Sequence, residues 1–319
     1  MINTKKPADI DKKTADWMFA FAEYNVEKAE NISYSNYSYW KSTVRTFARN
    51  KLAMAMLIIL VGFIVFAVVQ PFLPNQHDPT QVLYTTDPRM WRNAPSETHR
   101  FGTDQIGRDV WARVWSGTRL SLRLAVTVGI LEITVGVIMG ALWGYIKGID
   151  RIMTEIHNVI ANVPNLVLYT LLAFILRPGF WTIVFVMVVT GWIGMARFVR
   201  NMVMIIRDRE YNLASRTLGT PLHRMIIKNI LPFLVSVIIM RLAIAIPSVI
   251  NAEVGLSFLG IGLPVTYPTL GNQITTGQPL LRSAPHLMLY PAAALIVITI
   301  TTYVIGNAFS DASDPRNHT

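Results

Sequence analysis

The chain contains an uncharged apolar run that is long enough to cross a lipid bilayer. Residues 52–69 form eighteen consecutive positions without a charged side chain, and a run of this length is a candidate transmembrane helix. Five more stretches are predominantly apolar: 124–146, 152–176, 180–196, 230–250 and 287–309. Backbone groups in lipid must find their hydrogen bonds within the protein, so each stretch is expected to be helical. The sequence therefore predicts an all-α membrane protein with six transmembrane helices.

Positive charge is distributed unevenly among the segments that flank these runs. The net charge is +10, and Lys and Arg concentrate on the cytoplasmic side of membrane proteins. If the chain begins in the cytoplasm, nineteen Lys or Arg residues fall inside, nine fall outside, and Arg241 lies within a span. Both termini are therefore predicted to be cytoplasmic. Basic residues at the membrane edge account for most of the net charge, which consequently gives no support for nucleic-acid binding.

The predicted spans divide the chain into five parts. These are a cytoplasmic N-terminal segment (1–51), a first transmembrane helix (52–72), an extracellular loop (73–117), a five-helix core (118–309) and a cytoplasmic tail (310–319). The N-terminal segment is expected to end in an amphipathic helix close to the membrane, near residues 39–50. Within the core, residues 206–231 form a cytoplasmic loop, and residues 260–285 form an extracellular loop that folds back on the mouth of the bundle.

The cytoplasmic loop has the pattern of two short helices joined by a tight turn. Four residues recur at helical spacing: Tyr211, Ala214, Leu218 and Leu222. Gly219 suits the left-handed position that ends a helix. Thr220 and Pro221 then read as an N-cap and the first position of a second helix. Pro232 is expected to kink that second helix where it enters the bilayer.

The same loop resembles the cytoplasmic coupling loop of ATP-binding-cassette importer permeases. The family pattern is Glu-Ala-Ala, three residues, Gly, nine residues and Ile-x-Leu-Pro. Here the triplet reads Leu213-Ala214-Ser215 and Asn229 replaces the Ile, whereas Gly219 and Leu231-Pro232 stand at the family spacing. The resemblance implies contact with an ATPase partner through Glu210, Tyr211, Ala214, Ser215, Gly219, Pro221, Leu231 and Pro232. The alternative is an ordinary amphipathic loop that packs on its own bundle.

A second motif, FGTDQIGRD, occupies residues 101–109. Its glycine spacing is that of a phosphate-binding loop, but Arg108 and Asp109 replace the required Lys and hydroxyl residue, and no strand precedes it. It instead resembles the signature that follows the first helix of oligopeptide and dipeptide importer permeases. Charge-assisted hydrogen bonds are expected to hold a compact turn there, with direct substrate contact as the alternative. The predicted motif residues are Gly102, Asp104, Gly107, Arg108 and Asp109.

Two other segments resemble the same family. The segment AEVGLSFLGIG at 252–262 is similar to the family's Ser-Phe-Leu-Gly segment, and DASDPR at 311–316 is similar to its C-terminal tail. From about residue 40 to 316, the chain is similar to the C-type permease subunit of the peptide and nickel importer family. The resemblance implies the architecture of a type I ABC-importer permease in the bacterial plasma membrane.

The resemblance also implies a function and a set of partners. We expect uptake of oligopeptides driven by ATP hydrolysis outside this chain. The implied partners are a homologous B-type permease, two ABC ATPase subunits, an extracellular peptide-binding protein and the lipid membrane. ATP and Mg²⁺ would bind the ATPases, and no cofactor is expected on this chain. Import of dipeptides, nickel or another small solute is the alternative within the family, and a secondary transporter is the alternative outside it.

The second predicted span carries a face of small residues. Gly136, Gly140 and Gly144 recur every four residues beside Gly129, and this spacing lets another helix approach closely. Glu132 shares the face, so its carboxyl group is expected to point into the protein. An acidic residue within a span is a candidate functional group. The alternative is a buried structural carboxyl group that bonds to a neighbouring helix.

Other polar residues in the spans are candidates for a translocation pathway. The predicted set comprises Glu132, Asn162, Asn165, Arg241 and Glu253. Arg241 is expected to face an acidic partner or a wet pathway, but it lies about 18 Å along a helix from Glu253 and cannot pair with it. His157 is interpreted as a satisfied interior residue. The sequence shows no catalytic motif and no set of residues at metal-ligand spacing, so neither a catalytic residue nor a metal site is predicted.

Overall fold

The computed structural model describes residues 39–85, 87–177 and 179–313. The chain divides into two compact units, Met1–Ser42 and Thr43–Thr319, and the second contains every candidate membrane span. Most of the predicted N-terminal segment and the end of the predicted tail therefore lie outside the described residues. The expected helix near residues 39–50 is confirmed as α3 (Tyr39–Arg49).

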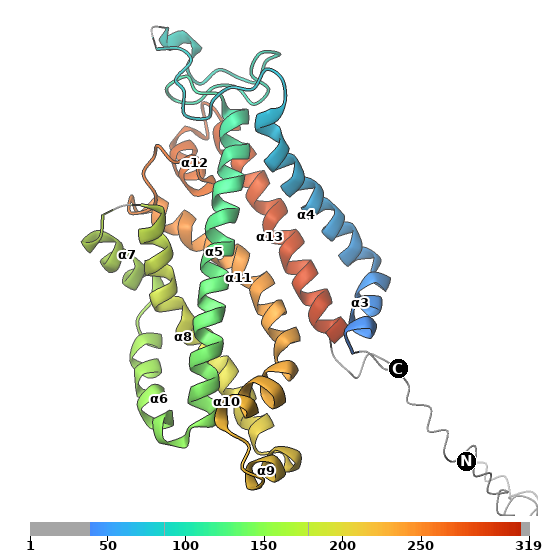
Figure 1. The fold of residues 1–319 in the computed structure, drawn as a ribbon. Coiled ribbons are helices and arrows are strands. Elements are labelled where there is room, and N and C mark those ends of the chain that lie inside the picture. The colour runs from blue at the N-terminus through green and yellow to red at the C-terminus, as the bar shows by residue number, and fades with distance from the viewer. Residues whose placement is uncertain (1–38, 86, 178, 314–319) are drawn as a thin grey trace, which may run out of the picture. The chain divides into compact units, whose positions relative to one another are not determined.

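Among the described residues, five helices are long and apolar enough to span a membrane (Figure 1). They are α4 (Lys51–Val69), α5 (Val110–Tyr145), α8 (Phe180–Arg207), α11 (Val235–Phe258) and α13 (His286–Ser313). Apart from the isolated bridge between Thr103 and Asp109, the described residues contain no β-structure. The prediction of an all-α membrane protein is therefore confirmed, with five or six candidate spans.

The third predicted span, 152–176, is not one continuous helix. It is divided into α6 (Lys147–Ala161) and α7 (Asn165–Ile175), which meet at a bend of 85°. Pro164 lies in the break between them. Proline has no backbone N–H and disfavours helical geometry at the residue before it, so the helix stops here.

The start of α5 also differs from the predicted start at residue 124. Asp109 caps the helix, because its side chain accepts a hydrogen bond from the Ala112 backbone N–H, and helical structure begins at Val110. Arg119 and Arg123, which the charge count placed outside the membrane, are therefore in the helix. Arg119 donates to the Ala67 carbonyl oxygen of α4. Similarly, α8 continues beyond the predicted end at residue 196.

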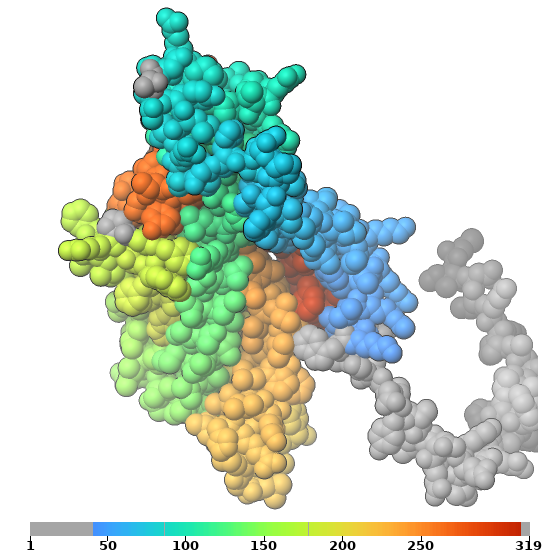
Figure 2. All heavy atoms as spheres, turned by 45° about the horizontal axis from the view of Figure 1, so that its top comes forward, coloured from blue at the N-terminus to red at the C-terminus, as the bar shows by residue number. Residues whose placement is uncertain are grey.

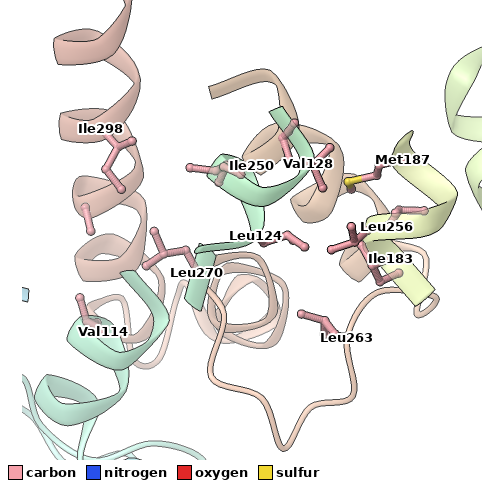
Figure 3. Close-up of a cluster of buried hydrophobic side chains, with 14 of the residues drawn as sticks. Val114, Leu124, Val128, Ile183, Met187, Ile250, Leu256, Leu263, Leu270 and Ile298 are labelled. Carbon is pink, nitrogen blue, oxygen red and sulfur yellow. The ribbon is translucent and has the colours of Figure 1, made fainter. Parts of the chain in front are cut away.

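The helices pack around a common apolar core. Figure 3 shows core side chains directed toward one another from α5, α8, α11, α13 and the short helix α12 (Leu270–Gly277). The labelled set includes Leu124, Ile183, Ile250, Leu270 and Ile298. The most extensive helix contact is between α5 and α8. Since α12 packs against α11, α13 and α5, loop 260–285 does fold back on the bundle.

Two irregular segments occupy opposite ends of the bundle. The segment between α4 and α5, residues 73–109, lies at the end where α5 begins, and Figure 2 shows its atoms gathered over that end. The segment that contains α9 and α10, residues 210–224, lies at the other end (Figure 1). These positions separate the two motifs by the length of the bundle.

Candidate functional site

The first helix of the predicted cytoplasmic hairpin ends at a left-handed glycine, as expected. Helix α9 (Glu210–Thr217) is followed by Leu218 and by Gly219 with φ +80°. A methyl group added at Gly219 would meet no atom within 4 Å. The requirement for glycine is therefore conformational, because a side chain is disfavoured at this φ whatever the available space.

The second arm of the hairpin is less regular than predicted. Helix α10 (Leu222–Arg224) makes one turn, continues as the π-helical segment η3 (Met225–Ile230), and then becomes the 3₁₀ turn η4 (Leu231–Phe233). Thr220 does not cap it, so that prediction was wrong. Its hydroxyl lies 2.8 Å from the Ser215 hydroxyl, which ties the two sides of the turn together. Pro232 lies in the 3₁₀ turn, so the helix is interrupted there rather than simply kinked.

The inner side of the hairpin is fixed to the bundle through a buried asparagine. Asn212 is fully buried, and its amide donates to the Ile206 carbonyl oxygen of α8 over 2.8 Å. Asn229, from the second arm, donates to the Asn212 side-chain oxygen over 3.2 Å. One side chain therefore joins both arms to α8. Asn212 was absent from the predicted site, although a polar side chain within an amphipathic helix was a usable signal.

An apolar cluster and an arginine strengthen this attachment. Met225, Ile226 and Ile230 pack with residues of α5 and α8. Arg207, at the end of α8, donates to the Gly144 carbonyl oxygen near the end of α5 over 2.8 Å. Its guanidinium also donates two hydrogen bonds to Asp208, which hold the pKa of that carboxyl group below its usual range.

The outer side of the hairpin exposes apolar side chains. Leu218, at the turn, is 86% exposed, and Tyr211, Leu213 and Leu222 are also exposed. Glu210 and Ala214 share this exposure, whereas Ser215 is half-buried. A projecting apolar group of this kind is typical of an interaction site. The hairpin thus packs on its own bundle through its inner side only. The alternative of an ordinary packed loop explains this inner side but not the exposed apolar side chains of the outer side.

At the opposite end, the FGTDQIGRD segment forms the expected compact turn. Asp104 accepts hydrogen bonds from the backbone N–H groups of Ile106 and Arg108, and from the Arg108 guanidinium over 2.7 Å. Gly102 and Gly107 both have φ +80°. Nearly all of these contacts are internal to the turn, which matches the structural interpretation of the motif.

Two residues that sequence reasoning missed complete this turn. Arg113 is buried, and its guanidinium lies 3.4 Å from Asp104 and donates to the Pro79 carbonyl oxygen. His99 lies 2.9 Å from Asp109. Burying such charged groups is costly unless each finds a partner. The network therefore holds the start of α5 in a single arrangement.

The glycine face of α5 packs against α8, as its spacing predicted. A side chain at Gly136 would meet Met195, and one at Gly140 or Gly144 would meet α8 backbone at Ala196 or Arg200. Gly129 instead faces Leu242 and Ala245 of α11. The partner of the glycine face is thus within this chain.

Glu132 faces a small polar cavity between four helices. The cavity has a volume of about 200 Å³, and its lining also includes Asn165, Tyr169 and Ser248. The carboxyl group lies against Gly191 of α8, where any side chain would collide with it. The structure therefore brings together two members of the predicted pathway set, Glu132 and Asn165.

The remaining members of that set lie elsewhere. Asn162 is exposed and bonds to the Asn158 carbonyl oxygen of its own helix. Arg241 is exposed, lies 4.3 Å above the Phe198 ring and forms no ion pair with a described carboxylate. Glu253 is fully buried and accepts hydrogen bonds from Ser257 and Thr269, so it joins α11 to the loop before α12.

His157 is an interior residue, in agreement with its interpretation. Its side chain is largely buried, and the Arg197 guanidinium donates to its Nδ1 atom over 3.0 Å. His157, Asn162 and Asn165 of the predicted third span therefore have different neighbours: Arg197, Asn158 and the cavity at Glu132.

This fold defines a multi-pass helical membrane protein. Residues 132–319 match the family described as binding-protein-dependent transport system inner membrane component. Residues 38–95 match the N-terminal transmembrane domain of oligopeptide transport permease C. The first match covers more than half of the chain, so the chain belongs to the family of inner membrane components of binding-protein-dependent transport systems. It is therefore a permease of the bacterial plasma membrane, a transport subunit rather than an enzyme.

Full-length relatives agree with this assignment. The chain is 38% identical to the oligopeptide transport system permease protein AmiD of Streptococcus pneumoniae, over 97% of this chain and 99% of the relative. It is 36% identical to the oligopeptide permease protein OppC of Bacillus subtilis, over 94% and 97% respectively. It is 37% identical to the dipeptide permease protein DppC of Bacillus subtilis, over 98% and 96%.

Proposed function

We propose that this chain is the C-type permease subunit of an ATP-driven ABC importer that takes up oligopeptides. The two relatives named as oligopeptide permeases align with nearly the whole chain, and the N-terminal family match carries the same cargo in its description. Dipeptides remain the alternative cargo, because a relative of similar identity is named as a dipeptide permease. The family match gives no support to a secondary transporter.

The proposed topology has six spans, with α6 and α7 together forming one broken span and both termini in the cytoplasm. Hairpin 210–231 is then cytoplasmic and segment 73–109 is extracellular. Their positions at opposite ends of the bundle support this arrangement. A cysteine-specific impermeant reagent tests it directly, because the chain has no cysteine of its own. Gln81→Cys should be labelled in intact cells, and Thr217→Cys only after permeabilisation.

The proposed partners are a homologous B-type permease, two ABC ATPases and an extracellular peptide-binding protein. The ATPases would bind ATP and Mg²⁺, and this chain would bind no cofactor. The observation that carries the proposal is the two-sided hairpin: exposed Leu218 and Tyr211 face outward, while Asn212 fixes the inner side to α8. Such a hairpin suits a partner that pushes on the permease from the cytoplasm.

The proposed mechanism is alternating access. Closure of the ATPases would move the hairpin, and the Asn212 contact and the buried cluster around Met225 would pass that movement to α8 and α5. The cavity at Glu132 lies between α5, α7, α8 and α11, so a relative movement of these helices would change its access. We propose that Glu132 and Asn165 lie beside the pathway, with Glu132 mainly structural.

Crosslinking and uptake test the proposal together. A cysteine at Leu218 should crosslink to an ATPase subunit, whereas a cysteine at exposed Val159 of α6 provides a matched control. Uptake of labelled peptides of graded length, compared with nickel in a deletion strain, identifies the cargo. If the cysteine at Leu218 crosslinks to an ATPase subunit but peptides are not taken up, the proposed coupling site stands and the proposed oligopeptide cargo is rejected. The absence of any ATPase crosslink would reject the coupling role.

A further inference from the structure

Three potential metal ligands come together in segment 73–109, at the edge of the FGTDQIGRD turn. His77 follows the end of α4, His99 precedes the FGTDQIGRD turn, and Asp109 caps α5. One ligand atom from each residue lies within 4.8 Å of the other two. The three positions are far apart in the sequence, so no local spacing could have predicted them together.

Two of the three residues are already oriented by other groups. The Tyr84 hydroxyl lies 2.9 Å from His99 Nε2, and the Ala112 backbone N–H donates to Asp109 Oδ2 over 2.9 Å. His99 Nδ1 and Asp109 Oδ1 remain directed toward each other, 2.9 Å apart. Metal-binding histidines are generally held in this way, with the second ring nitrogen bonded to a fixed partner.

His77 is positioned beside this pair. Its neighbour Gln76 accepts hydrogen bonds from Gln70 over 2.6 Å and from the Trp111 indole over 3.0 Å. The rings of His77 and His99 lie 5.3 Å apart at 36°. His77 forms no hydrogen bond with a described residue, so its ring is available.

A cavity opens onto the three side chains. It has a volume of about 710 Å³, and Tyr84 and Glu97 also line it. Two imidazoles and one carboxylate leave the fourth position of a tetrahedral ion for water or for Glu97. Ligand atoms around tetrahedral zinc are about 3.3 Å apart, which follows from bond lengths of about 2.0 Å.

We propose that His77, His99 and Asp109 form a binding site for a divalent transition-metal ion of the zinc class. Imidazole nitrogen with carboxylate oxygen is a donor set that such ions accept. In the bound form, His99 would carry its hydrogen on Nε2 and donate it to the Tyr84 oxygen, which leaves the Nδ1 lone pair for the metal. The ion would join the segment after α4 to the first turn of α5.

A hydrogen-bonded pair of His99 and Asp109 is the simpler alternative. It explains the contact between Nδ1 and Oδ1, but it gives no role to the second imidazole or to the cavity beside it. His77→Ala separates the two explanations. His77 makes no hydrogen bond to a described residue, so its loss leaves the pair intact.

Zinc binding to the purified protein tests the site. The full-length chain, isolated through a tag without histidine and together with its co-purifying subunits, is stripped with EDTA and titrated with Zn²⁺. We expect one zinc ion per chain and a higher melting temperature, because a ligand that binds only the folded state stabilises it. His77→Ala should abolish that increase, and Tyr84→Phe should weaken zinc affinity about 10-fold or more.

Two controls complete the experiment. His223→Ala removes an exposed imidazole far from the cluster, on α10, and should leave zinc affinity unchanged. Without zinc, the His77→Ala protein should melt as the wild type does, which excludes misfolding. Failure of the wild type to bind zinc, or unchanged affinity in His77→Ala, would overturn the proposal. Peptide uptake does not enter this test, so its outcome is independent of the proposed cargo.

Discussion

Asn212 and Ile206 are joined by a buried hydrogen bond of 2.8 Å that fixes the hairpin to the end of α8. Asn229 completes the contact from the other arm. The same amide group thus holds three segments: α8, α9 and η3. Any movement of the hairpin tip must either carry α8 with it or break these bonds.

We predict that Asn212→Ala weakens the coupling between ATP hydrolysis and transport. The substitution leaves the Ile206 carbonyl oxygen and the Asn229 amide without their partner, and an unsatisfied buried group costs about 1–3 kcal/mol. The complex should assemble with reduced peptide-stimulated ATP hydrolysis, measured in proteoliposomes. Asn201→Ala, at an exposed position on α8, is the control and should behave as the wild type.

Gly219→Val should lower transport and ATP hydrolysis together while the complex still assembles. The left-handed backbone at this position costs about 1 kcal/mol for a residue with a side chain, and relief of the strain redirects the second arm. Gly148→Val is the matched control, because Gly148 also has no atom within 4 Å of an added methyl group but does not have a positive φ. Normal uptake by Gly219→Val would remove the conformational argument.

Even a methyl group on the glycine face of α5 should destabilise the permease. In Gly140→Ala the new carbon meets the Ala196 carbonyl oxygen of α8, so the two helices must separate. Overpacking of this kind typically costs about 1–3 kcal/mol. Gly62→Ala on α4 meets no atom within 4 Å and should be neutral. The comparison is made by thermal melting in detergent, and equal melting temperatures would contradict the packing role.

Glu132→Gln should preserve most uptake if the carboxyl group is mainly structural. The amide occupies the same volume against Gly191 and faces the same polar cavity. Glu132→Leu should impair the protein more, because it places an apolar side chain among Asn165, Tyr169 and Ser248. If Glu132→Gln assembles normally but loses uptake, the charge itself acts in the pathway. Glu155→Gln, at an exposed position on α6, is the control.

Local patterns predicted the parts of the fold that depend on local geometry. Gly219 lies between two helical patterns, and only glycine adopts its backbone conformation readily. The spacing of Gly136, Gly140 and Gly144 likewise requires a neighbouring helix. The sequence could not say that this neighbour is α8, because that depends on how the chain folds back.

The sequence-based predictions failed where contacts with residues distant in the sequence decide the local structure. Arg113 was predicted in loop 73–117 and Arg119 was counted outside the membrane, but both lie in α5, where the carbonyl oxygens of Pro79 and Ala67 accept their hydrogen bonds. Thr220 has a side chain suited to an N-cap, but its hydroxyl is hydrogen-bonded to the Ser215 hydroxyl instead. His77, His99 and Asp109 meet only because segment 73–109 closes on itself. A short stretch of sequence cannot identify these partners.

The π-helical segment η3 makes the two connections of the hairpin mechanically unequal. One connection is short and stiff, since α8 passes into α9 through a bonded turn at Asp208 and Arg209. The other passes through a wide helical turn, a 3₁₀ turn and Pro232 before α11 begins, and such irregular helical segments often mark hinges. Under the proposed coupling role, a push on the hairpin would therefore move α8 directly, whereas the irregular connection would take up part of the movement before it reached α11.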